Sequence, residues 1–355
     1  MRNKYRFTAV LLLAIAVCAY LLTGIYVKSE KTDTDGQFLV VTSFYPMYIA
    51  ALNVAGDCEN IRLENLSEPQ TGCLHDFQMT PEDMKLLSTA DVFVVNGGGM
   101  ESFLTDVAKQ YPNLLIVESM TGEHAEEEHV HEEEHAAEEE HVHEEAHAAE
   151  EEHVHEEEHA AEEEHVHEEA HVHADGSVHT HSHENTHVWM SVAHHREQIA
   201  AITHGLCEAI PAYAEEFEAN AAEYDAKLAD LQKQQEELVS LSTGKEIIAF
   251  HEAYEYLAED YGMEIAYTMN LDEERQISAG EVADVLAAVK EHGIDLIFAE
   301  ELYGRGLAET VQKEADVTVC YLDTLVRGEY EADSYIKGMQ KNIDIVKSAL
   351  GMEAP

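Results

Sequence analysis

The chain has 355 residues and a formal net charge of −53, with 73 acidic residues against 20 basic ones. A chain of this length is long enough for about two domains. A surface with so large an acidic excess repels nucleic acid and attracts cations. Composition therefore excludes nucleic-acid binding and directs attention to cationic ligands.

The first 35 residues are typical of an export signal followed by a polar tether. Three basic residues precede an apolar run from Phe7 to Val27. About 20 apolar residues can span a bilayer as a helix whose basic flank stays in the cytoplasm. No small-residue cleavage site is obvious, which favours an uncleaved anchor through residues 7–27 over a cleaved signal peptide. Cys18 leaves lipid attachment as a third alternative. All three place the rest of the chain outside the cytoplasm.

Four cysteines lie beyond the N-terminal apolar run, an even number that suits disulfides in an oxidising compartment. Cys58 and Cys73 close a short loop, so we expect a disulfide there. It would hold His75, which follows two residues later. A second pairing, between Cys207 and Cys320, and a set of four buried thiols remain open alternatives.

The segment after the tether alternates strands with helices. Short apolar runs rich in β-branched residues predict the strands. Thr80 as a cap, with Pro81 in the first turn, marks the start of one helix. Such alternation implies a largely parallel sheet covered on both faces. The predicted strands are 38–42, 61–66, 91–95 and 114–117, and the predicted helices are 48–55, one beginning at Pro81, and 101–109.

Between Glu123 and His183 the chain repeats His-Val-His and Glu-rich blocks, with a unit that recurs every twelve residues. Seventeen of the 24 histidines lie in this segment. Neutral imidazole is the commonest protein ligand for zinc and similar metals, so the composition indicates metal binding. The segment lacks apolar faces and its carboxylates repel each other, so we expect a mobile, disordered loop without a core.

An uninterrupted run of helix-forming residues follows from Pro211 to about Leu241. Its apolar residues keep roughly helical spacing, without the strict heptads of a coiled-coil dimer. About 30 residues in one helix would measure about 45 Å. We therefore expect a rigid strut between two lobes of a monomer.

A second alternating series comes after this helix, with Ser278 and Glu281 as a capping box for one of its helices. The predicted strands are 247–250, 264–267, 294–299 and 317–321, and the predicted helices are 253–260, 281–291, 307–314 and 335–350. The expected fold class is α/β. It comprises two lobes, each with a mostly parallel sheet flanked by helices, joined by one long rigid helix, with the His/Glu-rich loop in the first lobe.

The boundaries that we expect follow from this organisation. They are 1–35 for the anchor or signal peptide and tether, 36–209 for the first lobe with 123–184 as its metal-binding loop, 210–243 for the linking helix, and 244–355 for the second lobe.

Histidines outside the repeat stand where the ends of predicted strands could gather them. In open α/β sheets, ligands bind at the carboxyl ends of the strands. His251 directly follows one strand, Asp323 follows another, His75 lies in a loop of the first lobe, and His187 ends the repeat segment. Three imidazoles and a carboxylate make a tetrahedral site that suits Zn²⁺. For the other histidines an ordinary surface or core role is expected: His194, His195, His204 and His292.

Four ordered motifs resemble the metal-binding proteins of zinc and manganese ABC importers, the ZnuA/TroA-like family. They span nearly the whole chain after the tether, and the acidic His-rich insertion before His187 is typical of the zinc branch. The motifs are Val40-Val41-Thr42-Ser43-Phe44-Tyr45-Pro46-Met47-Tyr48, Cys73-Leu74-His75-Asp76-Phe77-Gln78-Met79-Thr80-Pro81-Glu82-Asp83, Asn185-Thr186-His187-Val188-Trp189-Met190-Ser191 and Phe250-His251-Glu252-Ala253-Tyr254.

The resemblance implies that His75, His187 and His251 bind the metal between the lobes. Manganese-type members usually have Glu in the third position, so His251 there favours Zn²⁺. Asp323 matches an Asp that serves as the fourth ligand in some members, although the residues after it depart from the pattern. Glu300 or Glu301 and a water molecule remain alternatives for that position.

The resemblance further implies that the transported ligand is Zn²⁺ and that the partner is an ABC permease membrane subunit with a cytoplasmic ATPase. Two alternatives stay open: the same importer role for Mn²⁺ or Fe²⁺, and a stand-alone extracytoplasmic zinc buffer or chaperone. An enzyme is not expected. His251-Glu252 begins like a zinc-protease signature, but Glu255 stands where the second His should be.

Overall fold

The computed structural model describes residues 37–56, 58–68, 77–120, 170–172, 178–180, 185–269, 271 and 277–352. The chain divides into two compact units. The first contains residues 1–122 and 185–355, and therefore both predicted lobes, and the second is 123–184. Within the second unit, β5 (Ala170–Val172) and β6 (Val178–Thr180) form an antiparallel pair in which His171 lies opposite His179.

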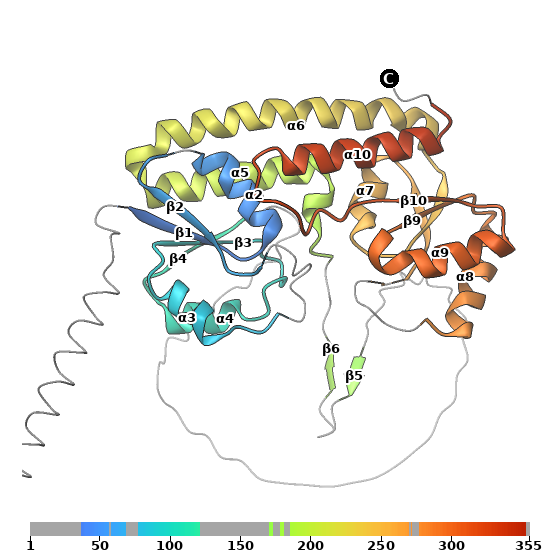
Figure 1. Cartoon of the computed structure of the whole chain (residues 1–355), viewed down its shortest axis with the longest axis horizontal. Coiled ribbons are helices and arrows are strands. Elements are labelled where there is room, and N and C mark those ends of the chain that lie inside the picture. Colours follow the sequence, from blue (N-terminus) through green and yellow to red (C-terminus); the bar gives the residue numbers. More distant parts are fainter. Residues whose placement is uncertain are drawn as a thin grey trace, which may run out of the picture. The chain divides into compact units, whose positions relative to one another are not determined.

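The first lobe is a sheet of four parallel strands in the order β2-β1-β3-β4 (Figure 1). Every strand that was predicted from the sequence is present, with boundaries that differ by one or two residues. The strands are β1 (Phe38–Thr42), β2 (Ile61–Asn65), β3 (Val92–Val95) and β4 (Leu115–Glu118), and the helices are α2 (Tyr45–Ala55), α3 (Pro81–Leu87), α4 (Leu104–Gln110) and α5 (Val192–Ala209), with the 3₁₀ turn η1 (Val188–Met190) before α5.

The second lobe repeats this plan with four parallel strands in the order β10-β9-β7-β8. The strands are β7 (Glu246–Ala249), β8 (Glu264–Thr268), β9 (Leu296–Ala299) and β10 (Thr318–Tyr321), and the helices are α7 (Tyr254–Asp260), α8 (Ala279–His292), α9 (Glu301–Glu314) and α10 (Ser334–Ala349). Read from β8, the order is second, first, third and fourth, as in the first lobe. In each sheet the order of the strands therefore changes direction beside the first strand, between β1 and β3 in the first lobe and between β7 and β9 in the second. α/β sheets form their ligand sites at such a switch point.

A long helix, α6 (Ala214–Ser242), connects the lobes, preceded by the short turn η2 (Pro211–Tyr213). It has 29 residues, so the predicted strut is present but starts later than residue 210, because Pro211–Tyr213 form a separate 3₁₀ turn. The helix packs against α2 and α5 of the first lobe and against α7 and α10 of the second. Figure 1 shows α6 running above both sheets, with α10 beside its second half on the side of the second lobe.

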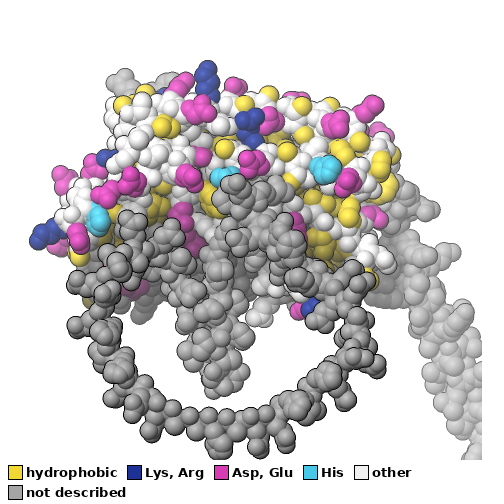
Figure 2. All heavy atoms as spheres, turned by 180° about the vertical axis from the view of Figure 1, so that it is seen from behind, with side chains coloured by type: hydrophobic (Ala, Val, Ile, Leu, Met, Phe, Trp, Pro, Cys, Tyr) yellow, Lys and Arg dark blue, Asp and Glu magenta, His cyan; other side chains and the backbone are white. Residues whose placement is uncertain are grey.

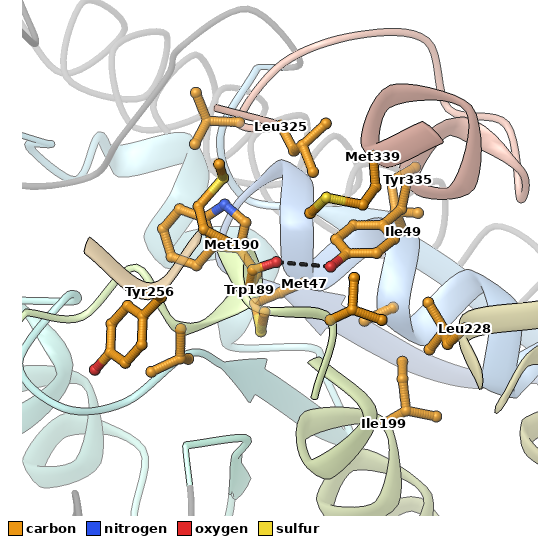
Figure 3. Packing of buried hydrophobic residues seen from close by; sticks show 14 of the residues in the cluster. Met47, Ile49, Trp189, Met190, Ile199, Leu228, Tyr256, Leu325, Tyr335 and Met339 are labelled. Carbon is orange, nitrogen blue, oxygen red and sulfur yellow. Dashed lines mark hydrogen bonds between the residues drawn. The ribbon is translucent and has the colours of Figure 1, made fainter. Parts of the chain in front are cut away.

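The two lobes share one apolar core. Alternate strand residues face it, such as Val40 and Val94 in the first sheet and Ile247 and Phe298 in the second, together with Leu228 of α6. Figure 3 shows the part of this core around Trp189 and Met339. The strand residues that alternate with these point to the opposite face of each sheet. There they pack into a smaller apolar core, one in each lobe. Both faces of each sheet are thus buried, as parallel sheets require.

The residues after β10 return from the second lobe to the first. Asp323 accepts a hydrogen bond from the backbone N–H of Leu325 at 2.8 Å, and Leu325 has a φ of 59°, a left-handed conformation that is costly for a residue with a side chain. Further along, the Tyr45 hydroxyl donates to the carbonyl of Glu329 at 2.8 Å, and Tyr48 packs on Tyr330 with ring centroids 4.0 Å apart. The segment between β10 and α10 is therefore a second connection between the lobes besides α6.

Three helix starts differ from the sequence-based expectation. The first helix begins at Tyr45 rather than at residue 48, with Pro46 in its first turn, and α4 begins at Leu104 rather than at residue 101. The helix predicted for 307–314 begins at Glu301, although two glycines, which are poor helix formers, stand in its first turns. The Thr80 cap and the capping box of Ser278 with Glu281 are formed as predicted, and Asp83 in addition completes a capping box with Thr80.

Two cysteines of the described part, Cys207 and Cys320, are free thiols. Cys320 is buried in β10, and Cys207 is half-buried on α5; neither forms a disulfide. These two residues are therefore not paired with each other. Cys58 is buried, but its predicted partner Cys73 lies outside the described residues, so that disulfide stays a prediction.

The described part of the chain contains no helix that is both long and apolar enough to cross a membrane. The predicted span 7–27 lies outside the described residues. On the face shown in Figure 2, acidic side chains are widespread and basic ones are few, in keeping with the composition.

One glycine makes a close approach possible between α5 and the edge strand of the first sheet. A Cβ atom on Gly205 would lie 2.5 Å from Cγ1 and 2.6 Å from Cγ2 of Val117, whose short side chain cannot move away. Gly306, on α9, has no neighbouring atom within 4 Å of such a Cβ. Because alanine favours helices over glycine by about 1 kcal/mol, Gly306→Ala should stabilise the protein.

Gly205→Ala gains the same propensity but forces an atom into a filled space, which costs about 1–3 kcal/mol. We expect the free energy of unfolding of Gly205→Ala to lie below that of Gly306→Ala by about 1–3 kcal/mol, measured by urea unfolding. Equal stabilities of the two variants would contradict the close packing of α5 on β4.

Candidate metal site

His187 and His251 come together at the junction of the lobes. His187 immediately precedes η1, and His251 follows β7 at the point where the second sheet reverses direction. Their ring centroids lie 5.0 Å apart with the planes at 90°. Both side chains are buried, with exposures of 0% and 2%. The structure therefore pairs two of the histidines that the sequence singled out, one from each lobe.

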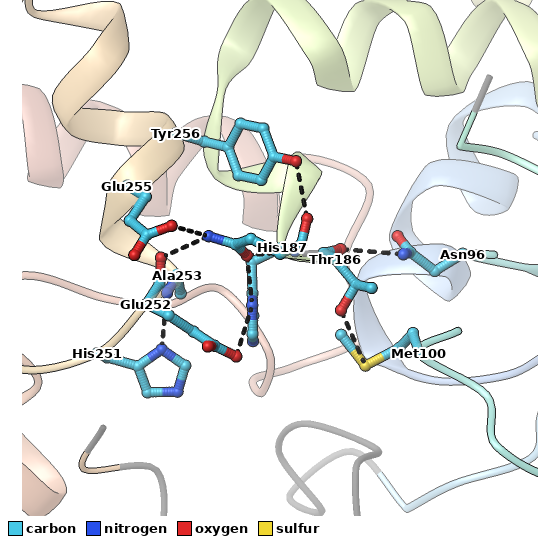
Figure 4. Close-up of polar contacts among 10 residues, drawn as sticks. Asn96, Met100, Thr186, His187, His251, Glu252, Ala253, Glu255 and Tyr256 are labelled. Atoms are coloured by element: carbon cyan, nitrogen blue, oxygen red, sulfur yellow. Dashed lines mark hydrogen bonds and ion pairs between the residues drawn. The ribbon is translucent and has the colours of Figure 1, made fainter. Parts of the chain in front are cut away.

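The Nδ1 atom of His187 has two polar neighbours. It lies 3.0 Å from Oδ1 of Asn185 and 3.7 Å from a carboxylate oxygen of Glu252 (Figure 4). The backbone N–H of His187 also donates to Oδ1 of Asn185, at 3.1 Å. Trp189 packs beside the ring at a centroid distance of 5.1 Å. The imidazole is thus oriented through one nitrogen.

The Nδ1 atom of His251 acts as a hydrogen-bond acceptor. This nitrogen accepts a hydrogen bond from the backbone N–H of Ala253 at 2.9 Å, at the start of α7. A neutral imidazole has one protonated and one unprotonated nitrogen, so this contact places the ring proton on Nε2. If the ring binds a metal through Nε2, its proton must move to Nδ1, facing the Ala253 N–H. Binding in that mode therefore requires the ring to turn.

Helix α7 holds both ends of the segment that carries His187. At one end the hydroxyl of Tyr256 donates to the carbonyl of Asn185 at 2.7 Å. At the other end Asp260 accepts from the Ser191 hydroxyl at 2.8 Å and from the backbone N–H of Val192 at 3.1 Å. The second lobe thus caps the N-terminus of α5, a helix of the first lobe.

A buried polar network supports the same segment from the first lobe. Asn96 donates through Nδ2 to the carbonyl of Thr186 at 3.0 Å, and its Oδ1 accepts from Gln198 at 2.9 Å. Glu101 accepts from the Ser43 hydroxyl and from the backbone N–H of Asn96. Burial raises the pKa of Glu101 above its ordinary value, although these hydrogen bonds oppose the shift. The loop before His187 therefore rests on satisfied polar groups.

Asp323, the predicted fourth ligand, makes other contacts in this structure. Its carboxylate accepts from Leu325 N–H, and it lines a small cavity with an empty volume of about 290 Å³ beside Tyr45 and Arg327. Glu300, an alternative for the same position, lies 3.7 Å from the guanidinium of Arg327 and is largely buried. Glu301, the other carboxylate alternative, forms an ion pair with Arg305 within α9.

The third predicted histidine, His75, lies outside the described residues. Within the described ranges, no three His, Cys, Asp or Glu side chains are placed so that they could hold a metal ion together. The pair of His187 and His251 is what the described part of the chain contributes. The ligand set of four residues stays a prediction.

The remaining histidines have ordinary partners. His195 is fully buried, stacks on Tyr335 with centroids 3.9 Å apart, and contacts Gln198, and burial lowers its pKa to about 4. His204 and His292 lie 3.6 and 3.4 Å from carboxylate oxygens of Glu208 and Glu246, and His194 packs edge-on against Tyr256 with ring centroids 5.3 Å apart.

Sequence reasoning did not find Asn185, Asp260 or Tyr256 as parts of the site. Asn185 is two residues before His187, and this proximity was the only signal available. Asp260 and Tyr256 lie roughly 70 residues away from the groups that they contact. Nothing in a single sequence indicates such long-range hydrogen bonds.

The cap that Asp260 provides makes stability depend on pH. Burial, the largest cause, raises the pKa of Asp260 to about 6, while the Ser191 and Val192 hydrogen bonds and His194 oppose the shift. A carboxyl group with a raised pKa in the folded state binds its proton more tightly there than in the unfolded chain. Its contribution to stability is therefore full below its ordinary pKa and is lost as pH rises through about 6.

Asp260→Asn should remove this dependence, because the amide oxygen can accept from Val192 while its nitrogen donates to the Ser191 hydroxyl. We expect the stability of the variant relative to the wild type to increase by about 2–3 kcal/mol from about pH 4 to pH 8. Urea unfolding of both metal-free proteins across this range measures it. A constant difference would show that Asp260 does not titrate with folding.

Comparison with known proteins places this geometry in a family. The family model described as zinc-uptake complex component A, periplasmic (ZnuA), matches residues 40–349. The high-affinity zinc uptake system protein ZnuA of Bacillus subtilis is 30% identical over 352 residues, which cover 96% of this chain and 97% of that protein. The zinc-binding lipoprotein AdcA of Streptococcus pneumoniae is 28% identical over 97% of this chain, and the match spans 61% of AdcA.

Solved structures agree on the fold. Zn(II)-bound AdcA from Streptococcus pneumoniae has a TM-score of 0.63 at 24% identity, covering 90% of this chain and 59% of that one. The Ni²⁺ complex of FpvC from Pseudomonas aeruginosa has a TM-score of 0.63 at 20% identity over 89% of this chain and 97% of that one. Because the family match covers most of its length, this chain belongs to the ZnuA family, zinc-uptake complex component A.

Proposed function

We propose that this protein captures Zn²⁺ outside the cytoplasm and delivers it to the membrane subunit of an ABC permease whose ATPase is cytoplasmic. The observation that supports this most directly is the buried pair of His187 and His251, contributed by different lobes with rings 5.0 Å apart. The family match and the zinc-related names of the relatives support the same role. They also favour an extracytoplasmic location, with tethering through residues 7–27 as part of the proposal.

Zinc is the cargo in this proposal, and its ligands are His75, His187, His251 and Asp323. Imidazole nitrogens suit Zn²⁺, whereas sites rich in carboxylate and carbonyl oxygen suit Mn²⁺. Two buried imidazoles therefore favour zinc over manganese. Asp323 would have to exchange its hydrogen bond to Leu325 N–H for the metal, and a water molecule is the alternative fourth ligand.

Two stages of capture follow from this assignment. The His/Glu-rich segment 123–184 binds Zn²⁺ weakly at many His-X-His pairs and raises the local metal concentration. The site between the lobes then takes one ion tightly. Because α6, α10 and a shared core connect the lobes, loading is accompanied by small lobe motions rather than by wide hinge closure. The loaded form then docks on the permease.

Two alternatives keep the same site. An importer for Mn²⁺ or Fe²⁺ would use it with another ion; the two imidazoles argue against Mn²⁺, and the zinc-related names of the relatives favour zinc over Fe²⁺. A stand-alone zinc buffer would need the histidine repeats but no ordered pair of ligands, and His187 and His251 are ordered and buried. Catalysis has no support: the relatives are named for metal binding and uptake, and no second histidine completes a protease signature after His251.

Replacing either described histidine should abolish tight zinc binding. We expect His187→Ala and His251→Ala each to weaken zinc binding by more than about 100-fold, beyond the range given by outer contacts to ligands. His204→Ala is the matched control, because its side chain is exposed and lies beside Glu208 on the surface of α5. Competition with a chelator of known affinity measures all three, and wild-type affinity in both site variants would overturn the assignment.

Deleting residues 123–183 should separate the two classes of site. We expect isothermal titration calorimetry of the full chain to show one tight zinc and several weak ones, and the deleted protein to keep only the tight one. A deletion variant without a tight site would contradict the proposal that the weak sites lie in the repeat segment and the tight site lies between the lobes.

A further inference from the structure

Asn185 uses its whole hydrogen-bonding capacity to connect His187 with the second lobe. Its Oδ1 faces both the backbone N–H and the Nδ1 of His187, at 3.1 and 3.0 Å. Its Nδ2 donates to the carbonyl of Glu252 and to the carboxylate of Glu255, both at 2.9 Å. Its own carbonyl accepts from the Tyr256 hydroxyl at 2.7 Å. Figure 4 shows the partners His187, Glu252, Glu255 and Tyr256 close together.

The partners fix the orientation of the amide. A side-chain amide has an oxygen that only accepts and a nitrogen that only donates. The carbonyl of Glu252 and the carboxylate of Glu255 can only accept, so they require the nitrogen on their side. The oxygen is therefore the atom that faces His187, where the backbone N–H supplies one donor. A flipped amide would leave donors facing donors on one side and acceptors facing acceptors on the other.

This orientation determines the tautomer of His187. Since Oδ1 of Asn185 can only accept, Nδ1 of the imidazole must carry the proton that it receives. A neutral ring with the proton on Nδ1 has its lone pair on Nε2, the form that can bind a metal through that atom. The carboxylate of Glu252 lies 3.7 Å from the same Nδ1, beyond hydrogen-bonding distance.

We propose that Asn185 is a positioning residue, which sets the tautomer of His187 and connects this ligand to α7, the helix that directly follows His251. The inference rests on the proposed function insofar as His187 binds zinc. In metal sites, the outer group that accepts from a ligating histidine fixes both its tautomer and its ring orientation. Here an amide performs that task, and its other end is anchored to the lobe that supplies the second ligand.

An amide suits this position better than a carboxylate would. Asp at residue 185 would keep an oxygen for His187 but would lose both donors toward Glu252 and Glu255. It would also place a third negative charge beside these two acidic side chains, and like charges at such distances repel. The variants Asn185→Asp and Asn185→Ala therefore separate the two roles: Asp keeps the acceptor for His187 and loses the anchor, and Ala loses both.

The first measurement reads the tautomer of the metal-free protein. Nitrogen-15 NMR of histidine-labelled protein, at a pH where the ring is neutral, distinguishes a protonated Nδ1 from a protonated Nε2. We expect the Nδ1–H form of His187 in the wild type and in Asn185→Asp, and a clear shift toward the Nε2–H form in Asn185→Ala. Glu252→Gln should leave the wild-type tautomer in place.

The second measurement is zinc affinity by chelator competition. We expect Asn185→Ala to weaken zinc binding about 10–100-fold, the range found for outer contacts of metal-binding histidines. Asn53→Ala is the matched control, because Asn53 also donates an amide hydrogen bond, to the carbonyl of Ala332, but contacts neither histidine. Its affinity should stay at the wild-type value.

The outcomes distinguish this proposal from the proposed function. An unchanged tautomer in Asn185→Ala, or a shift in Glu252→Gln instead, would overturn the role of Asn185, and neither result depends on zinc. A wild-type protein without a tight zinc site would overturn the proposed function, even if the tautomer followed Asn185 as expected. If Asn185→Ala fails to fold, Asn185→Asp and Glu252→Gln still test the assignment of the acceptor.

Discussion

The apolar core that the two lobes share is the constraint on which the rest of the structure depends. Residues of both sheets and of α6 form one continuous buried cluster, so neither lobe has its inner core to itself. Close-packed interiors move as units rather than deform continuously. The relative position of the carboxyl ends of β1 and β3 and of β7 and β9 is therefore set by packing. That is the region where His187 and His251 meet.

Polar contacts at the junction of the lobes then fix the positions of His187 and His251 more closely than the shared core does. Helix α7 contacts both ends of the segment from Asn185 to Val192, and the hydroxyl of Tyr335 donates to the carbonyl of Trp189 at 2.8 Å (Figure 3). These bonds join groups that are buried or partly buried, where an unpaired polar atom is costly. The two rings consequently occupy their positions as part of the fold. The two Nδ1 atoms differ in their partners: that of His187 faces the amide oxygen of Asn185, and that of His251 accepts from the backbone N–H of Ala253.

Much of the fold could be predicted from the sequence because its signals are local. The strand runs, the Thr80 cap, the Ser278 capping box and the long helix each depend on neighbouring residues, and all are present. Helix starts were less accurate where local propensity opposed tertiary packing, as at the glycines of α9. The pairing of His187 with His251 followed from strand ends and family resemblance. The groups that hold them, Asn185 and Asp260, did not, because their partners are distant in the chain.

The protonation states of Cys207 and Cys320 decide whether these two residues could compete for zinc with the site between the lobes. Thiolate sulfur is a strong zinc ligand, whereas a protonated thiol is not. Burial raises the pKa of Cys320 to about 12, and burial with the nearby charge of Glu218 raises that of Cys207. Both sulfurs therefore remain protonated at neutral pH. A metal ion at the surface finds imidazole and carboxylate there, and no soft donor on these two residues to retain it.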